Sequence, residues 1–191
     1  MKRIILVSLV LLIVSFSLEA YSAPMRIGIC PSLLMGRFDY FDADDSDFYG
    51  YDLHSTIGID LSISYPIYNF LDIQAGGTYF SQTTTGIDYT DNGVQISSIY
   101  LNARMVGNKI SSLGGFQPYA GLGLNYGFFQ LEIEDIAIHG NIGYQIFVGG
   151  YIADVIPVEI GYIHLNGSGS GSDENGFLPG LYVKGGYAFS L

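Results

Sequence analysis

The chain has 191 residues, of which 49% are hydrophobic, 15% aromatic and only 13% charged. Its formal net charge of −11 argues against a nucleic-acid partner, because nucleic-acid binding needs a basic surface. A single cysteine excludes a disulfide scaffold and a thiolate zinc finger. The 26 glycines, 16 tyrosines and 12 phenylalanines argue against a helical protein, since glycine and aromatic residues are poor helix formers.

The first 22 residues have the features of an export signal. Lys2 and Arg3 precede an apolar run from Ile4 to Leu18, and Ala20 and Ser22 supply the small residues of a cleavage site. We therefore predict a cleaved signal peptide at 1–22 and one mature domain at 23–191, the alternative being a retained N-terminal membrane helix. Cys30 lies well beyond the apolar run, so we expect a buried thiol and not a lipid anchor.

Apolar residues recur at every second position through the rest of the chain. Ile57, Ile59, Leu61, Ile63 and Tyr65 alternate with small or polar residues, which predicts a strand with one apolar face. The same alternation at 26–36, 71–79, 98–105, 120–128, 142–152, 158–162 and 181–191 brings the total to about eight strands. The first of these segments fits the alternation less well, and Pro31 in it predicts a bulge or an edge-like kink.

This alternation fits a soluble sandwich or barrel, whose apolar faces point inward, or a membrane barrel, whose apolar faces meet lipid. The composition of the strand faces and the lengths of the connections distinguish the two. The non-apolar faces are rich in Gly, Ser and Asn, and Tyr and Phe lie near the strand ends, which favours a membrane barrel with a narrow lumen and aromatic girdles. Long links at 37–55, 82–93, 130–140 and 166–178 alternate with shorter ones at 66–69, 107–115 and 154–156. The predicted fold is all-β: an eight-stranded antiparallel transmembrane β-barrel, an up-and-down meander in the bacterial outer membrane. A soluble exported barrel is the alternative.

Two segments resemble a known family. The C-terminal run 187–191 resembles the terminal strand by which bacterial outer-membrane proteins are recognised for assembly, with Leu191 in place of the usual Phe. The segment 118–127 is similar to the fifth strand of small eight-stranded barrels such as the membrane domain of outer-membrane protein A and opacity-type surface proteins. The resemblance implies outer-membrane lipid, lipopolysaccharide and the barrel-assembly machinery as partners. It does not imply an activity, because this fold hosts pores, adhesins, enzymes and structural proteins.

Five ionisable residues fall on the faces that would point into the barrel. By parity these inward residues are Asp60, Asp72, Arg104, Glu159 and Lys184. An unpaired charge in such a narrow lumen is costly, so we expect a buried ion-pair network that fills it. The alternative is a proton or ion path.

The first long link is strongly acidic. Its carboxylates include Asp39, Asp42, Asp44, Asp45 and Asp47, interleaved with aromatic residues. Such oxygen ligands suit Ca²⁺ or Mg²⁺, but the spacing does not match a known calcium loop. A solvated loop beside anionic lipopolysaccharide and a docking surface for an extracellular partner are the alternatives, and no other cofactor is indicated.

The last predicted hairpin resembles the layout of the lipid A 3-O-deacylase family. His164 would align with that family's catalytic histidine, but the nucleophilic serine falls on Asn166, and Ser168 and Glu174 are the nearest substitutes for serine and acid. We therefore expect a structural or surface-interaction role through the outer loops. A lipid A-modifying enzyme and a small pore are the alternatives.

Overall fold

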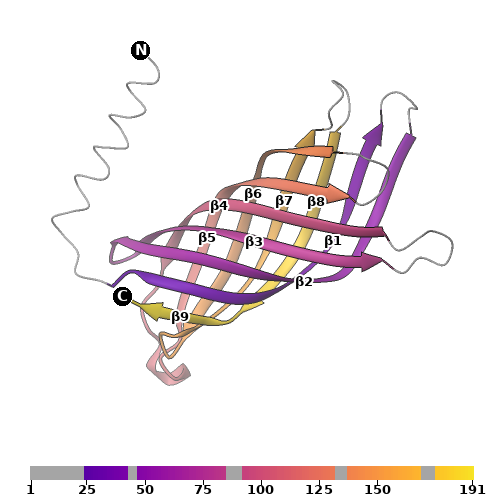
Figure 1. Ribbon diagram of the computed structural model, residues 1–191. Coiled ribbons are helices and arrows are strands. Elements are labelled where there is room, and N and C mark those ends of the chain that lie inside the picture. Colours follow the sequence, from indigo (N-terminus) through magenta and orange to yellow (C-terminus); the bar gives the residue numbers. More distant parts are fainter. Residues whose placement is uncertain (1–23, 43–46, 85–91, 132–136, 169–174) are drawn as a thin grey trace, which may run out of the picture.

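The computed structural model describes residues 24–42, 47–84, 92–131, 137–168 and 175–191, which lie almost entirely in strands (Figure 1). The predicted signal peptide at 1–22 lies outside these ranges. The described part holds a single one-turn 3₁₀ helix, η1 (Ser111–Leu113), and no helix in it has the length and hydropathy needed to cross a bilayer.

Consecutive strands pair antiparallel along the whole chain. In order they are β1 (Arg26–Asp42), β2 (Asp47–Tyr68), β3 (Leu71–Thr84), β4 (Asn92–Val106), β5 (Gln117–Leu131), β6 (Ala137–Ile152), β7 (Ile156–Ser168), β8 (Asn175–Gly185) and β9 (Tyr187–Ser190). β1 pairs with β2 on one side and with β8 and β9 on the other, so the sheet closes on itself. The predicted all-β antiparallel meander barrel is confirmed.

The nine strand segments form the eight strands of the barrel, because β9 continues β8 alongside β1. Both pair with β1 in the same register, which has Ser32 opposite Lys184 in β8 and Ile29 opposite Tyr187 in β9. The ladder is interrupted between these two pairs, at Cys30 and Pro31, and Pro31 has no N–H to donate to it. On the other side Pro31 pairs regularly with Ile59, and the irregularity between β1 and β2 lies further along, at Leu34–Gly36. The prediction of a bulge at Pro31 is therefore wrong. Instead, the hydrogen-bonded ladder of β1 is interrupted at Pro31 on the side that faces β8 and β9.

The two ends of the barrel differ. At one end, here called the turn end, lie Leu191, whose N–H donates to the Met25 carbonyl over 2.8 Å, and the turn that carries η1 (Figure 1). At the opposite end, here called the loop end, the connections fall outside the described residues. Strands of 11 to 22 residues, not counting β9, are long enough for the ~9–11 residues that cross a bilayer, and most of them exceed this length.

These long strands correct the predicted loop lengths. β1 and β2 stay paired as far as Asp42 opposite Asp47, so the predicted 19-residue link at 37–55 is largely a hairpin. The links predicted at 82–93, 130–140 and 166–178 are likewise shortened, because the strands on either side run into them. The aromatic and β-branched residues in these segments favour extended backbone, and this preference outweighed their polar character.

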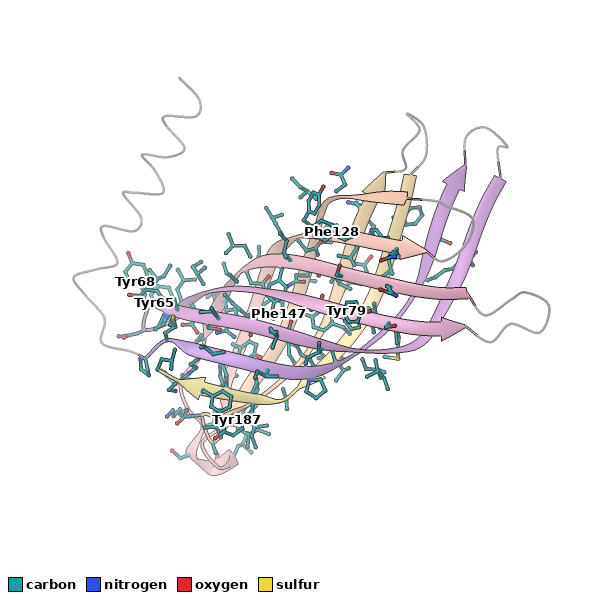
Figure 2. All side chains as sticks on the ribbon, in the orientation of Figure 1. Tyr65, Tyr68, Tyr79, Phe128, Phe147 and Tyr187 are labelled. Atoms are coloured by element: carbon teal, nitrogen blue, oxygen red, sulfur yellow. The ribbon has the colours of Figure 1, made fainter. Side chains whose placement is uncertain are left out.

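The outer wall of the barrel is apolar, as the alternation predicted. Its exposed side chains include Ile57, Leu61, Ile99, Leu122, Leu124, Ile146, Ile160 and Leu181. Aromatic residues lie toward both ends of this apolar belt: Tyr65, Tyr68 and Tyr187 toward the turn end, and Tyr79 and Phe128 toward the loop end (Figure 2). This is the surface expected of a barrel wall in contact with lipid.

Candidate functional site

Inside the barrel, large side chains pack against glycines on the neighbouring strand. The phenol of Tyr100 lies over Gly76, where a Cβ atom would come within 2.6 Å of the ring. Tyr182 lies over Gly161 in the same way, with a ring carbon 2.7 Å from the position of a Cβ. An eight-stranded barrel is just wide enough for such packing, so a larger residue at either glycine would displace an interior ring.

The interior near the turn end holds an arginine cluster. Arg104 on β4 donates from Nη2 to Asp72 Oδ2 over 2.9 Å and from Nη1 to the Tyr151 hydroxyl over 3.0 Å. Only 1% of Arg104 is exposed. Its guanidinium also lies 4.9 Å from the centre of the Tyr119 ring, a cation–π distance. Arg26 covers the other side of this cluster, with its guanidinium 4.4 Å from the centre of the Tyr151 ring.

The middle of the interior holds a lysine between two carboxylates. Lys184 Nζ lies 3.1 Å from Glu159 Oε1 and 3.4 Å from Asp60 Oδ1. Both carboxylates also accept hydrogen bonds from phenols: Tyr182 and Tyr119 donate to Glu159 over 2.8 and 3.0 Å, and Tyr100 donates to Asp60 over 2.8 Å. The structure thus brings the five predicted inward ionisable residues into two adjacent clusters, of which the tyrosines are an essential part. The sequence analysis did not predict the tyrosines as hydrogen-bond partners of the carboxylates, although the alternation along 98–105 already placed Tyr100 on an inward face.

A row of neutral polar groups adjoins the charged clusters. Asn102 donates to Gln74 Oε1 over 3.0 Å and accepts from Gln145 over 2.7 Å, and Thr78 and Ser98 share a hydrogen bond of 2.7 Å. The side chains in these bonds, apart from half-buried Thr78, are buried. The row ties β3, β4 and β6 together across the lumen.

Space inside the barrel is small and uneven. A cavity of about 140 Å³ opens beside Arg26 and Asp72 at the turn end. Two further voids of about 10 Å³ each touch Asp60 and Lys184, and one of them extends to Arg104, whose Nε has no partner among the described residues. A void of that size has room for about one water molecule.

Most of the buried side chains that the structure describes toward the loop end of the interior are apolar. Seven side chains that are at most 5% exposed form this group, which we call the apolar plug: Leu34, Phe80, Ile96, Phe129, Ile163, Leu165 and Leu178. They come from β1, β3, β4, β5, β7 and β8, so the plug crosses the barrel. The sequence analysis placed small and polar residues on every inward face, and this expectation is wrong for the loop end.

His164 lies on the outside of the barrel wall. It pairs across the sheet with Tyr144 on β6 and Pro179 on β8. Its ring stacks between those of Tyr144 and Phe177, with centroids 5.1 and 6.3 Å away. Asn166, in the place of the deacylase serine, donates to the Ile142 carbonyl over 2.8 Å. The Ser168 side chain and Glu174, the other two candidates of the deacylase constellation, lie outside the described part of the chain.

The acidic residues of the first hairpin are only partly covered by the structure. Asp39 accepts from Arg37 Nε over 2.7 Å. Asp42 and Asp47 pair through their backbones, but their side chains, like Asp44 and Asp45, lie outside the description. Within the described residues there is no group of three or more His, Cys, Asp or Glu residues placed to hold a metal ion.

Comparison with known proteins identifies the fold. No protein-family model matches the chain, and no curated protein matches it. Among solved structures, the outer membrane protein OprG of Pseudomonas aeruginosa is 15% identical, with a TM-score of 0.56 over 90% of this chain and 99% of OprG.

Two further solved structures match with lower scores. Ail, the attachment invasion locus protein of Yersinia pestis, is 13% identical with a TM-score of 0.45 over 87% of this chain and 97% of Ail. Neisserial surface protein A is 15% identical with a TM-score of 0.48 over 84% of this chain and 95% of its own. The match to OprG, together with the closed sheet, shows that the chain has the fold of a small eight-stranded outer-membrane β-barrel.

Proposed function

We propose that the protein is an outer-membrane barrel closed to ions, which acts as a structural scaffold and presents its loop end to partners at the cell surface. The apolar outer wall, with aromatic residues toward both ends, supports the membrane location. The predicted signal peptide at 1–22 would supply export. The C-terminal segment ending in Phe189 and Leu191 would serve recognition by the barrel-assembly machinery.

The single observation that carries this proposal is the filling of the lumen. From the turn end inward, an ion crossing the barrel meets Arg104 paired with Asp72, then Lys184 between Asp60 and Glu159. It then meets the apolar plug, whose Leu34, Ile96, Leu165 and Leu178 are each 0% exposed. Moving a charge through a layer lined mainly by such apolar side chains is strongly unfavourable.

The voids in the lumen support the same conclusion. The cavity of about 140 Å³ lies at the turn end, and two voids beside Asp60 and Lys184 measure about 10 Å³ each. The apolar plug lies between these voids and the loop end. A small pore would need a continuous polar path, and the mostly apolar side chains described toward the loop end argue against one.

The loop end is the part of the molecule that would meet other molecules. β1 and β2 project furthest there (Figure 1), and they carry the acidic and aromatic residues of the first hairpin. Lipopolysaccharide would surround the barrel wall just below this hairpin. An extracellular partner would be met by the hairpin and by the three other loop-end connections.

Electrical recording tests the proposal directly. The mature chain, refolded in detergent, is first shown to be folded by a heat-dependent change in gel mobility and a β-type far-UV circular dichroism spectrum. It is then added to planar lipid bilayers. We expect no conductance above the protein-free bilayer. Reproducible single-channel steps that scale with the amount of folded protein would overturn the closed barrel in favour of a small pore.

A further inference from the structure

The cavity of about 140 Å³ at the turn end has a cationic wall. Arg26 and Ser64 line this cavity together with Asp72, and the same two residues also line the void of about 10 Å³ that reaches Arg104. The void therefore adjoins the cavity, and both arginines lie at this end of the lumen. Ser64, which is 4% exposed, adds a hydroxyl group to the wall.

The guanidinium of Arg26 is held in place but has no acceptor. It lies over the ring of buried Tyr151, 4.4 Å from the ring centre, and stacking of this kind leaves the N–H donors at the edges of the guanidinium free. None of these donors has a hydrogen-bond or ion-pair partner among the described residues, although the C-terminal residue Leu191 lies at the same end of the barrel. A free guanidinium edge has the geometry to bind an oxyanion with two parallel hydrogen bonds.

The charges in the lumen place a positive excess at this end. Arg26 and Arg104 carry two positive charges against the single negative charge of Asp72. Further in, Lys184 carries one positive charge against the two carboxylates that flank it. An anion is therefore attracted to the mouth of the lumen and repelled from its middle, so the cavity is suited to hold an anion and not to pass it on.

The size and the apolar part of the wall identify the class of anion. Pro24, Pro66 and Val106 line the cavity beside its polar groups. A volume of about 140 Å³ is close to that of an engineered cavity of ~150 Å³ that holds benzene, a molecule of roughly six non-hydrogen atoms. A carboxylate with a tail of about three carbons has that size, whereas an inorganic oxyanion would leave the apolar wall uncovered.

We propose that the turn-end cavity binds a short-chain carboxylate monoanion. The carboxylate accepts hydrogen bonds from the free edge of Arg26, and the alkyl tail packs against Pro24, Pro66 and Val106. In the proposed orientation the turn end faces the periplasm, so the ligand is a solute of that compartment. A ligand that binds only the folded state stabilises it by mass action, so the site makes the stability of the barrel depend on a small periplasmic acid.

Nuclear magnetic resonance of the refolded mature protein in detergent tests the site directly, with sodium butyrate as the probe. Beyond residue 22 the chain has three arginines, Arg26, Arg37 and Arg104, so arginine-selective isotope labelling gives a small set of Nε–H signals. Arg26→Gln and Arg37→Gln assign them. Butyrate should shift the Arg26 signal in a saturable way, whereas sodium chloride at the same ionic strength should not. Arg37, which is 60% exposed at the loop end, is the internal control and should not respond.

Calorimetric titration of variants measures the contribution of the guanidinium. Arg26→Gln should weaken butyrate binding about tenfold, because a charge-assisted pair of hydrogen bonds is lost. Arg26→Lys keeps the charge but not the planar edge and should bind with intermediate affinity. The matched control Lys109→Gln removes an exposed cation at the same end of the barrel, paired with Asp154, and should leave the affinity unchanged.

A ligand series separates the charge from the tail. From acetate to propionate to butyrate the affinity should rise by about fourfold with each added methylene, because each buries apolar surface against the prolines. Butyramide, which has the same shape without the charge, should bind at least tenfold more weakly than butyrate, on the order of one charge-assisted contact. Inorganic phosphate should also bind more weakly, because it has no tail.

Equal responses of Arg26 and Arg37 to butyrate would overturn the proposal, as would equal affinities for Arg26→Gln and the parent chain. Butyramide or phosphate binding as tightly as butyrate would overturn the assignment to a carboxylate. Each variant is checked by its heat-dependent gel mobility, so a folding defect is recognised separately. The bilayer recordings keep the two proposals apart: a conducting parent chain would overturn the closed barrel and leave these affinities as they are, whereas an unresponsive Arg26 in a non-conducting barrel would overturn the carboxylate site alone.

Discussion

The two halves of the lumen are packed with side chains of different chemistry, charged in one half and apolar in the other. Toward the turn end and the middle, the lumen holds two ion-pair clusters centred on Arg104 and Lys184, whose carboxylates also accept hydrogen bonds from tyrosine hydroxyls. Toward the loop end it holds the side chains of the apolar plug, among them Phe80 and Phe129. Both halves are enclosed by one continuous sheet, so the difference comes from the side chains and not from the backbone.

The comparison shows what each half contributes to the fold. Burying charged groups costs desolvation free energy, which their mutual attraction roughly offsets, so the polar half adds little net stability. Removing one partner is nevertheless strongly destabilising, because it leaves a buried charge unpaired. Burying apolar groups stabilises in proportion to area, at roughly 25 cal/mol per Å². The long strands leave room at the loop end for a core like that of a soluble protein, whereas the polar half lies within the apolar belt.

The largest expected effect comes from Lys184→Met. The substitution keeps most of the side-chain volume but leaves Asp60 and Glu159 as two buried carboxylates without their cation. Breaking a buried pair in this way costs about 3–5 kcal/mol. The free energy of unfolding of the refolded protein in detergent, measured by urea titration, should fall by about that amount.

Lys109→Met is the control for that measurement. Lys109 also pairs with a carboxylate, at 2.5 Å from Asp154 Oδ2, but both side chains are more than 40% exposed. Exposed pairs contribute only about 0–1 kcal/mol. Similar losses in the two variants would mean that the Lys184 cluster is open to water and that the polar half is not a closed network.

A somewhat smaller effect is expected from Leu178→Ala in the apolar plug. Leu178 is 0% exposed, and truncation of a buried leucine typically costs about 2–5 kcal/mol because it leaves a cavity. Leu181 on the same strand faces outward with 52% exposed and serves as the control. Leu181→Ala should change the free energy of unfolding by less than half as much, and equal losses would contradict the placement of Leu178 inside the barrel.

The outer wall and the inward charges could be predicted from sequence, because both follow from one rule. Along a strand, residues two apart share a face, so the apolar run 57–65 fixes Asp60 as inward without any knowledge of its partners. What parity does not give is which strand faces which across the lumen. For that reason the pairing of Asp60 with Tyr100 and Lys184, which come from distant strands, appears only in the structure.

The apolar plug escaped prediction for a different reason. At the loop end both faces of a strand are apolar, as in Tyr79–Phe80 and Phe128–Phe129, and a rule that assigns apolar residues to the outside cannot interpret such pairs. The predicted loop lengths were wrong for a related reason. Polar residues were interpreted as loop residues, whereas the strands continue through them. His164 could be placed by parity on the outer wall, but its stacking on Phe177 depends on the register of β7 with β8.

The smallest effect, and the one that sharpens the comparison most, is expected from Tyr182→Phe. Tyr182 donates to Glu159 over 2.8 Å, and the change removes this bond while the ring stays over Gly161. Glu159 keeps Tyr119 and Lys184, so the free energy of unfolding should fall by only about 1–2 kcal/mol, within the range for one hydrogen bond to a charged group. Tyr187→Phe, on the outer wall with 47% of Tyr187 exposed, is the matched control and should change the free energy of unfolding by less than about 0.5 kcal/mol.

Combined with Lys184→Met, Tyr182→Phe should lower the free energy of unfolding by more than the two single losses added together, because Glu159 would then depend on Tyr119 alone. Strict additivity would mean that the tyrosine and the lysine act independently, and the polar half would then be a set of separate contacts and not one network.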